Sequence, residues 1–158
     1  MIVMLLGTNP YPFNRLLKAV DELASATGEK VVAQVGHTKL PAPHVDCHDF
    51  VPHDQIVDWL READLAISQG GFGSLRDCLR AGKPTIAVPR KPELGECQDI
   101  QTEVVYALAA EGRVLVLEDM KDLAGTIEAA RRMTVRPATA SRIPAIVAGK
   151  ISEISKNP

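Results

Sequence analysis

Short apolar runs alternate along the chain with longer segments whose apolar residues recur at helical spacing. Leu16, Leu17 and Val20 show this spacing in a segment that Gly28 closes. Further helices are expected after Pro52 and at residues 72–81, 104–110 and 120–133. The apolar runs have the length of buried strands and lie at residues 2–6, 30–35, 45–50, 65–68, 85–88 and 114–117. This alternation predicts an α/β fold, a doubly wound, Rossmann-like parallel sheet.

The pattern changes after residue 133. Residues 134–141 are interpreted as a short linker, and the apolar positions beyond them share one face of an expected amphipathic helix. These positions are Ile143, Ile146, Val147, Ile151 and Ile154. The helix either packs back on the domain or docks on a partner. We therefore divide the chain into a domain at residues 1–133 and a linker with C-terminal helix at residues 134–158.

Composition indicates an aliphatic core in one domain. The chain has 158 residues, of which 46% are hydrophobic and 4% aromatic, as suits a parallel sheet covered by helices. A net charge of −2 predicts no basic face for nucleic acid. Cys47, Cys78 and Cys97 have no paired spacing, so we expect reduced thiols in a cytoplasmic protein. The first residues are typical of a strand rather than a signal peptide, and no apolar run has membrane-spanning length.

The stretch Ser68-Gln69-Gly70-Gly71-Phe72-Gly73-Ser74 carries the clearest chemistry. It follows an expected strand directly and leads into a helix. Glycines allow close approach of the backbone to a ligand, and the free N–H groups of a helix start favour a phosphate. Asp77 lies about one helical turn further on, where its carboxylate can accept hydrogen bonds from a ribose. The alternative is a tight strand-to-helix turn without a ligand.

Three loops are expected to meet at the carboxyl ends of the strands, where open α/β sheets bind ligands. They are residues 7–9, 70–74 and 90–99. In the third loop, Arg90 or Lys91 can neutralise a pyrophosphate, and the alternative is that both are simply solvated.

Gln98 and Asp99 follow in the same loop. Their planar polar groups suit sugar hydroxyls as hydrogen-bond partners. The alternative is that they form the polar first turn of the next helix.

A local cluster of His44, Cys47, His48 and His53 invites a zinc interpretation. The cluster straddles an expected strand, however, where alternate residues face opposite sides. Cys47 is expected to point to the core, so we predict no metal site.

Other nucleotide and catalytic motifs are missing from the sequence. No Gly-Lys-Ser/Thr follows the glycine turn, so it is not a P-loop. The turn after the first strand, Gly7-Thr8-Asn9-Pro10, lacks the dinucleotide fingerprint, which disfavours a nicotinamide enzyme. No Ser/His/Asp or Cys/His spacing indicates a hydrolase.

Taken in order, several motifs resemble the C-terminal, donor-binding domain of family 28 glycosyltransferases, the MurG-like group of GT-B enzymes. The chain is most similar to short PssE-like members and to the small subunit of the eukaryotic two-part N-acetylglucosaminyltransferase. The resemblance covers residues 1–118. Its motifs are Leu6-Gly7-Thr8 with Phe13-x-Arg15-Leu16, Ala33-Gln34-x-Gly36, Ile67-Ser68, Gly71-x-Gly73-Ser74, Ala81-Gly82-Lys83-Pro84, Val88-Pro89-Arg90 and Gly95-Glu96.

The resemblance implies a UDP-sugar donor held by the backbone of residues 71–74, with Asp77 reaching the ribose and residues 96–102 near the sugar. UDP-sugar is then a substrate, and no cofactor is implied. Short members supply the donor half, while a membrane-associated partner binds a lipid-linked sugar acceptor. The implied donor-binding residues are Gly7, Thr8, Ser68, Gln69, Gly70, Gly71, Phe72, Gly73, Ser74, Asp77, Arg90, Glu96, Gln98 and Asp99.

The chain departs from its relatives at three positions where they usually have histidine. These positions carry Gln69, Cys97 and Gln101. Glutamine still donates and accepts hydrogen bonds, but it cannot carry a proton at neutral pH. Donor binding is compatible with these changes, whereas a proton-transfer role of those histidines is not. The catalytic residues remain unassigned.

The sequence therefore supports two alternative functions. The first is the donor-binding subunit of an inverting glycosyltransferase in polysaccharide or glycolipid synthesis, working at the inner face of a membrane through its partner. The second is a non-catalytic nucleotide-sugar-binding subunit that regulates a partner. A GT-B sugar epimerase is less favoured, because those enzymes need both halves in one chain.

Overall fold

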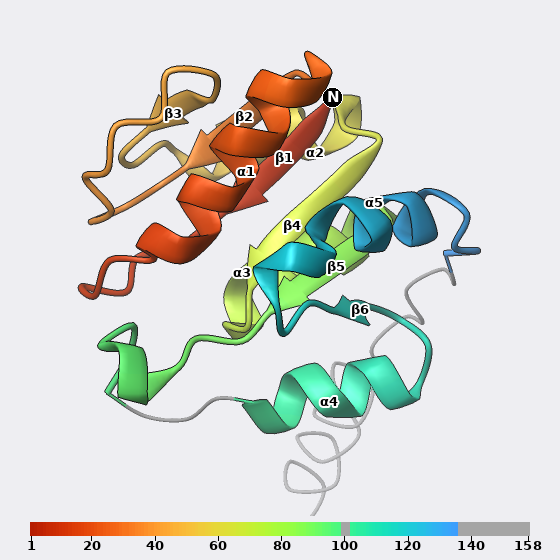
Figure 1. Ribbon diagram of the computed structural model, residues 1–158. Helices are drawn as coiled ribbons and strands as arrows, with labels where there is room; N and C mark the ends of the chain where they lie inside the picture. The colour runs from red at the N-terminus through yellow and green to blue at the C-terminus, as the bar shows by residue number, and fades with distance from the viewer. Residues whose placement is uncertain (99–101, 136–158) are drawn as a thin grey trace, which may run out of the picture.

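The computed structural model describes residues 1–98 and 102–135, which form one parallel six-stranded sheet with helices on both faces (Figure 1). Every strand pairing is parallel, and the order is β3-β2-β1-β4-β5-β6. The doubly wound α/β prediction is thereby confirmed. The strands are β1 (Ile2–Leu5), β2 (Val31–Gln34), β3 (Asp46–His48), β4 (Leu65–Gln69), β5 (Thr85–Val88) and β6 (Leu115–Val116).

The helices divide between the two faces of the sheet. Helices α1 and α5 cover one face, and α2, α3 and α4 pack on the other. The helices are α1 (Asn14–Thr27), α2 (His53–Glu62), α3 (Phe72–Arg80), α4 (Thr102–Ala110) and α5 (Leu123–Arg131), and the 3-10 turns are η1 (Pro92–Leu94) and η2 (Met120–Asp122). The expected amphipathic helix after residue 141 lies outside the described residues.

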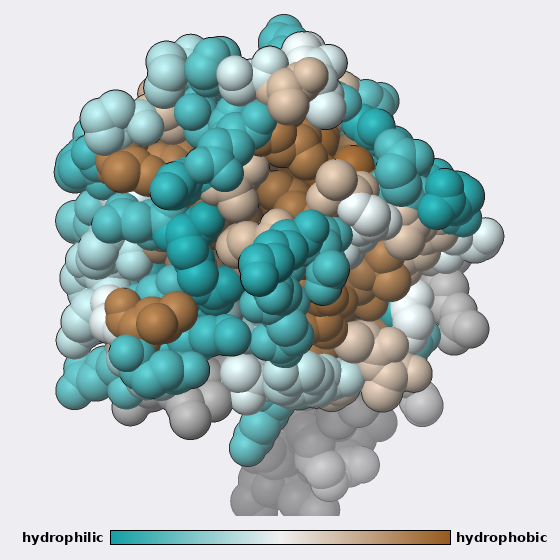
Figure 2. Space-filling view, in the orientation of Figure 1, coloured by the Kyte–Doolittle hydropathy of each residue, from teal (hydrophilic) through white to brown (hydrophobic). Residues whose placement is uncertain are grey.

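Strand β1 lies at the centre of the sheet and contributes to the core on both faces. Ile2 and Met4 pack beneath α1 and α5, whereas Val3 and Leu5 pack against α2 and α3 on the opposite face. Successive side chains of a strand point to opposite faces, and all four are buried because helices cover both faces. Figure 2 shows that apolar side chains also gather along the seam between α1 and α5, where Leu23 contacts the core.

Two details differ from the sequence prediction. The expected helix at residues 120–133 begins as the separate turn η2, because the Asp119 side chain accepts a hydrogen bond from Lys121 N and caps it there. Cys47 does not point to the core, so that prediction was wrong. It lies in the short edge strand β3 and is exposed, while Val45 just before the strand is the buried residue.

Candidate functional site

The strand order reverses between β1 and β4, and this is where an open α/β sheet leaves a crevice at its carboxyl edge. Three connections meet there, as Figure 1 shows for the β1–α1 loop and the η1 segment. Arg90 bonds to residues of all three, namely Leu6 and Tyr11 after β1, Gln69 at the end of β4 and Glu96 after β5. The crevice therefore has walls from segments that are far apart in sequence.

Gln34 builds the first wall. Its side chain is buried at the end of β2, where Oε1 accepts a hydrogen bond from Gly7 N at 2.9 Å and Nε2 donates to Gly7 O at 3.0 Å. Gly7 has φ +70°, a conformation that L side chains rarely adopt. Thr8 is thereby exposed at the crevice. The sequence placed Gln34 in the motif Ala33-Gln34-x-Gly36 but not among the donor-binding residues, although a polar residue ending an apolar strand was a usable signal.

Gln69 forms the floor between Gly7 and Gly71. It is 8% exposed, and a Cβ on Gly7 would lie 1.9 Å from its Nε2. A Cβ on Gly71 would lie 3.2 Å from the same atom. The adjacent Ser68 is fully buried and its hydroxyl donates to Gln69 O, so that hydroxyl supports the turn from behind.

The start of α3 opens onto the crevice. No side chain among the described residues caps this helix, and Gly71, Gly73 and Ser74 line the hollow beside it. A Cβ on Gly73 would meet no protein atom within 4 Å, so the missing side chain leaves crevice space. The first N–H groups of a helix lack intrahelical acceptors, and the helix dipole adds positive potential. This wall therefore suits an anion, as we expected for residues 70–74.

The hollow beside α3 is the larger of two in the crevice and has a volume of about 290 Å³. Its apolar side was missed from the sequence and comes from Phe50, Val51 and Ile56, just after β3 and in α2. Phe50 is 53% exposed, and its ring lies edge-on to His37 at 5.1 Å. An aromatic residue at the last position of the expected strand 45–50, just before the helix after Pro52, was the available signal. The hollow is lined by Gly7, Thr8, Gln34, Phe50, Val51, Ile56, Gln69, Gly71, Gly73, Ser74 and Asp77.

Asp77 projects into this hollow from α3. Its Oδ1 accepts hydrogen bonds from the neighbouring Arg76, and its Oδ2 lies 3.1 Å from His53 Nε2 of α2. The Asp77 side chain is 13% exposed, whereas the His53 ring is mostly exposed. The carboxylate is thus fixed in position at the rim of the hollow.

Arg90 lies behind the crevice and is nearly buried. Four of its five N–H groups donate within the protein, to Gln69 Oε1 and to the carbonyl oxygens of Leu6, Tyr11 and Glu96. Its guanidinium also lies 4.5 Å from the centre of the Phe13 ring. Burial lowers the pKa of Arg90, although the nearby Glu96 opposes that shift. Its charge is therefore held inside the protein rather than displayed as a solvated group.

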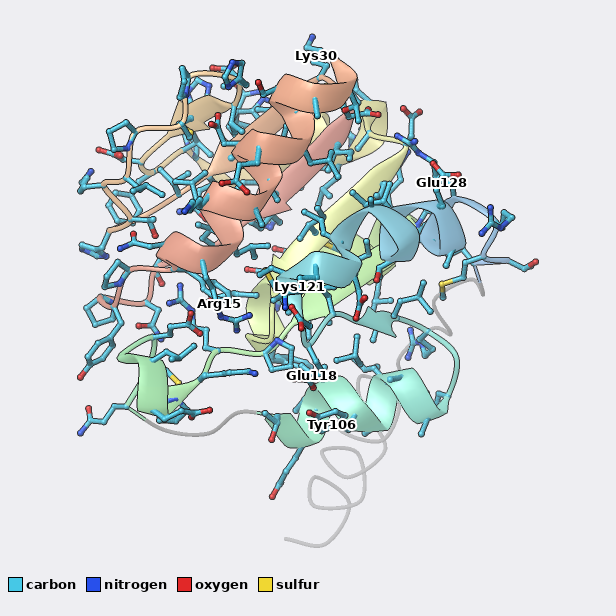
Figure 3. All side chains as sticks on the ribbon, viewed as in Figure 1. Arg15, Lys30, Tyr106, Glu118, Lys121 and Glu128 are labelled. Atoms are coloured by element: carbon cyan, nitrogen blue, oxygen red, sulfur yellow. The ribbon has the colours of Figure 1, made fainter. Side chains whose placement is uncertain are left out.

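Glu96 is held in the same way. Its Oε1 accepts from Arg15 Nε at 2.6 Å and its Oε2 accepts from Lys91 N at 2.9 Å. Arg15 Nη2 also donates to Pro89 O, and Figure 3 shows Arg15 at the end of α1 nearest the β5–α4 loop. Both oxygens of a carboxylate expected near the sugar are thus engaged within the protein.

A smaller hollow of about 40 Å³ shares Gln69 and Gly71 with the larger one. Asn9, Cys97 and Thr102 complete its lining together with Gly70 and Arg90. Gln98 is exposed in the same loop. Asp99 and Gln101 lie outside the described residues.

The three histidines considered as zinc ligands in the sequence pair with separate carboxylates. His44 lies 3.4 Å from Asp21 and His48 lies 3.1 Å from Asp46, while His53 faces Asp77. Within residues 1–98 and 102–135, no group of three or more such side chains is placed to hold a metal ion. No helix of that part of the chain is long and apolar enough to cross a membrane.

A family model described as "Glycosyltransferase family 28 C-terminal domain" matches residues 1–153. The chain belongs to this family. It is 34% identical over 108 residues to the UDP-N-acetylglucosamine--N-acetylmuramyl-(pentapeptide) pyrophosphoryl-undecaprenol N-acetylglucosamine transferase of Parasynechococcus marenigrum (strain WH8102). That match covers 65% of this chain and 29% of the relative. The chain therefore spans under a third of the length of this curated relative.

Solved structures agree on the fold of this family 28 domain. The glycotransferase of kitacinnamycin matches with a TM-score of 0.64 and 19% identity, over 82% of this chain and 34% of that one. The solution structure of ALG13 matches with a TM-score of 0.58 and 20% identity, over 91% of this chain and 90% of that one. The domain thus corresponds in fold to about one third of the first protein and to most of the second.

Proposed function

We propose that this family 28 domain binds a UDP-sugar and supplies the donor half of an inverting glycosyltransferase. The observation that carries the proposal is the uncapped start of α3, which opens through Gly71 and Gly73 onto the crevice between β1 and β4. A diphosphate at this point meets backbone N–H groups and the positive end of a helix dipole.

The hollows suggest an orientation for the donor. Phe50 and Ile56 give the larger hollow an apolar side for the base, and Asp77 supplies carboxylate oxygens for the ribose hydroxyls. The diphosphate then lies against the start of α3. The sugar points to the smaller hollow beside Asn9 and Thr102. This arrangement places the base on the apolar side of the crevice, and the ribose, the diphosphate and the sugar along its polar side chains and backbone groups.

The reaction we propose is direct displacement at the anomeric carbon. An acceptor hydroxyl forms the new glycosidic bond as the bond from the anomeric carbon to the UDP oxygen breaks, and UDP takes the electron pair. The N–H groups at the start of α3 stabilise the charge that develops on UDP. We expect no metal requirement, and we assign the base that accepts the hydroxyl proton to a partner.

The partner is proposed to be a membrane-associated protein that binds a lipid-linked sugar acceptor, in polysaccharide or glycolipid synthesis. The first support is that the chain spans 29% of a relative whose name includes a pyrophosphoryl-undecaprenol acceptor. The second is that two aromatic side chains are exposed at the crevice, Phe50 in the lining of the larger hollow and Phe72 at the start of α3.

Ligand-dependent thermal stability tests the donor assignment. UDP, UDP-N-acetylglucosamine, UDP-glucose and NAD would be compared at equal concentrations. A ligand present at 100 times its Kd stabilises by about 2.7 kcal/mol, which amounts to a shift of several degrees. We expect a shift with the UDP compounds and none with NAD. Shifts of equal size for NAD, or none with UDP, would contradict the donor assignment.

A non-catalytic nucleotide-sugar-binding subunit is the second candidate. It is favoured by Gln69 and Cys97, which line the smaller hollow and replace expected histidines. Transfer that appears with a partner and disappears in Asp77→Ala would support the transferase. Binding without transfer under every pairing would support the regulatory subunit.

A further inference from the structure

Arg90 and Gln69 form a hydrogen bond at the base of the crevice, from Arg90 Nε to Gln69 Oε1. Arg90 comes from the loop after β5 and Gln69 from the end of β4. Arg90 is 9% exposed and Gln69 is 8% exposed, so the contact is shielded from solvent. The pair therefore has a defined geometry before any ligand arrives.

The chemistry of the two groups determines which way the Gln69 amide points. A guanidinium has donors but no acceptor, so the group that faces Arg90 must be the amide oxygen. A flipped amide would place its NH2 group against the Arg90 N–H and remove that hydrogen bond. The unflipped amide directs Nε2 toward Gly7 and Gly71, at the lining shared by both hollows.

Arg90 cannot easily turn away from this role. Its Nη1 donates to Tyr11 O at 2.9 Å and to Glu96 O at 2.8 Å, and its Nη2 donates to Leu6 O at 3.0 Å. The Phe13 ring covers its face at 4.5 Å. The guanidinium is thus held by several groups that do not include Gln69.

We propose that Arg90 is a positioning residue that holds Gln69 as a hydrogen-bond donor to an oxygen of the donor diphosphate. This inference rests on the proposed function. Gln69 touches the ligand, and Arg90 acts through Gln69. The arrangement places a neutral donor opposite the N–H groups of α3, so that the diphosphate meets donors from two sides. It also gives Gln69 a role that does not require the proton carried by a histidine.

Gln69→Glu tests the donor role. The carboxylate keeps an acceptor for Arg90, so the variant is expected to fold, but it offers the diphosphate an oxygen instead of an N–H group. Binding of UDP and of uridine would be measured by NMR titration for the wild type and the variant. We expect UDP affinity to fall at least tenfold and uridine affinity to change less than twofold. An unchanged ratio of the two affinities would overturn the inference.

The positioning role of Arg90 is tested by a double-mutant cycle. Arg90→Met is expected to weaken UDP binding when Gln69 is present and to have little further effect when combined with Gln69→Met. Equal effects in the two backgrounds would show that Arg90 does not act through Gln69. The affinity for uridine is measured in the same variants. A general structural defect would lower it together with the affinity for UDP, whereas loss of a diphosphate contact would lower only the affinity for UDP.

A wild-type measurement is decisive even if the Arg90 variants fail to fold. In isotope-labelled protein, the Gln69 side-chain NH2 protons should show nuclear Overhauser effects to the α-protons of Gly7 and Gly71. Effects to the Arg90 Nε proton instead would mean a flipped amide and overturn the inference. Failure of the wild type to bind UDP at all would contradict the proposed function itself, whichever way the amide points.

Discussion

Gln34 and Gly7 form two hydrogen bonds, so that a side chain completes the pairing of β2 with β1 beyond the last strand residue. Gln34 Nε2 donates in addition to Asp49 O, which connects the loop after β3 to the same point. The crevice wall at Gly7 thus depends on one buried amide. Without it, Gly7 N loses its acceptor.

Replacing Gln34 should therefore destabilise the domain. Gln34→Met keeps the length of the side chain and removes its hydrogen bonds, which costs about 2 kcal/mol for buried groups left unpaired. The free energy of unfolding in urea measures this loss. Gln55→Met, at an exposed position of α2, is the control and should change stability by less than about 0.5 kcal/mol. Equal effects would contradict the role given to Gln34.

Gly7→Ala and Gly28→Ala separate backbone strain from steric clash. Both glycines have φ +70°, so alanine should cost about 1 kcal/mol or more at either position. A Cβ on Gly28 meets nothing within 4 Å, whereas one on Gly7 overlaps Gln69 Nε2. We expect the larger loss of stability for Gly7→Ala, together with weaker UDP binding. Calorimetric unfolding and titration with UDP would check both, and similar behaviour of the two variants would exclude the clash.

Gly73→Val should impair binding without unfolding the protein. A Cβ at Gly73 or at Gly125 meets no protein atom within 4 Å, and both residues lie near the start of a helix. Only Gly73 lines the larger hollow. We expect Gly73→Val to lower UDP affinity at least tenfold and Gly125→Val to leave it unchanged, with both Tm values close to that of the wild type. Wild-type affinity in a folded Gly73→Val protein would refute the phosphate site at α3.

The Arg15–Glu96 ion pair should be worth more than a surface pair. Its side chains are 19% and 6% exposed, against 69% and 67% for Lys18 and Glu22 of α1. Removing one partner of a buried pair costs about 3 kcal/mol, whereas exposed pairs contribute well under 1 kcal/mol. Glu96→Ala and Glu22→Ala, compared by urea unfolding, should differ accordingly. A difference below about 1 kcal/mol would mean that the loop carrying Glu96 is held by other contacts.

Cys78 should be unreactive in the native protein. Burial raises the pKa of its thiol to about 12 from 9.0, and the neighbouring Asp77 adds to the shift. Because the folded state favours the protonated thiol, its contribution to stability is complete below pH 9 and is lost as pH rises toward 12. At pH 8, iodoacetamide should modify the exposed Cys47 before Cys78. Cys78→Ala should weaken the loss of stability between pH 9 and 12, and an unchanged profile would contradict the shift.

The sequence was sufficient for the fold because the central strands are buried on both faces. Such strands appear as mostly apolar runs, and the runs expected at residues 2–6 and 65–68 correspond to the neighbouring strands β1 and β4. The side chains of an edge strand are less constrained to face the core. The prediction that Cys47 faces the core was wrong because Cys47 lies in the short edge strand β3.

The glycine turn and Asp77 were also recognisable from the sequence, since residues 68–77 are local. The packing of Arg90 and Glu96 was not, because Leu6 and Arg15, which bond to them, lie some 80 residues away in the chain. A charged residue in a loop looks solvated until the carbonyl groups around it are known. The contribution of Phe50 to the hollow depended on tertiary placement in the same way.

The network of hydrogen bonds around Arg90 has a consequence for the affinity of the crevice for a ligand. Its bonds to Leu6, Tyr11 and Glu96 restrict residues 6–11 after β1 and residues 90–96 after β5 together. Loops that are already ordered lose little conformational entropy when a ligand arrives, which favours affinity. Slow amide hydrogen exchange at residues 6–11 and 90–96 of the unliganded protein, changing little on addition of UDP, would be the signature of such a preorganised crevice.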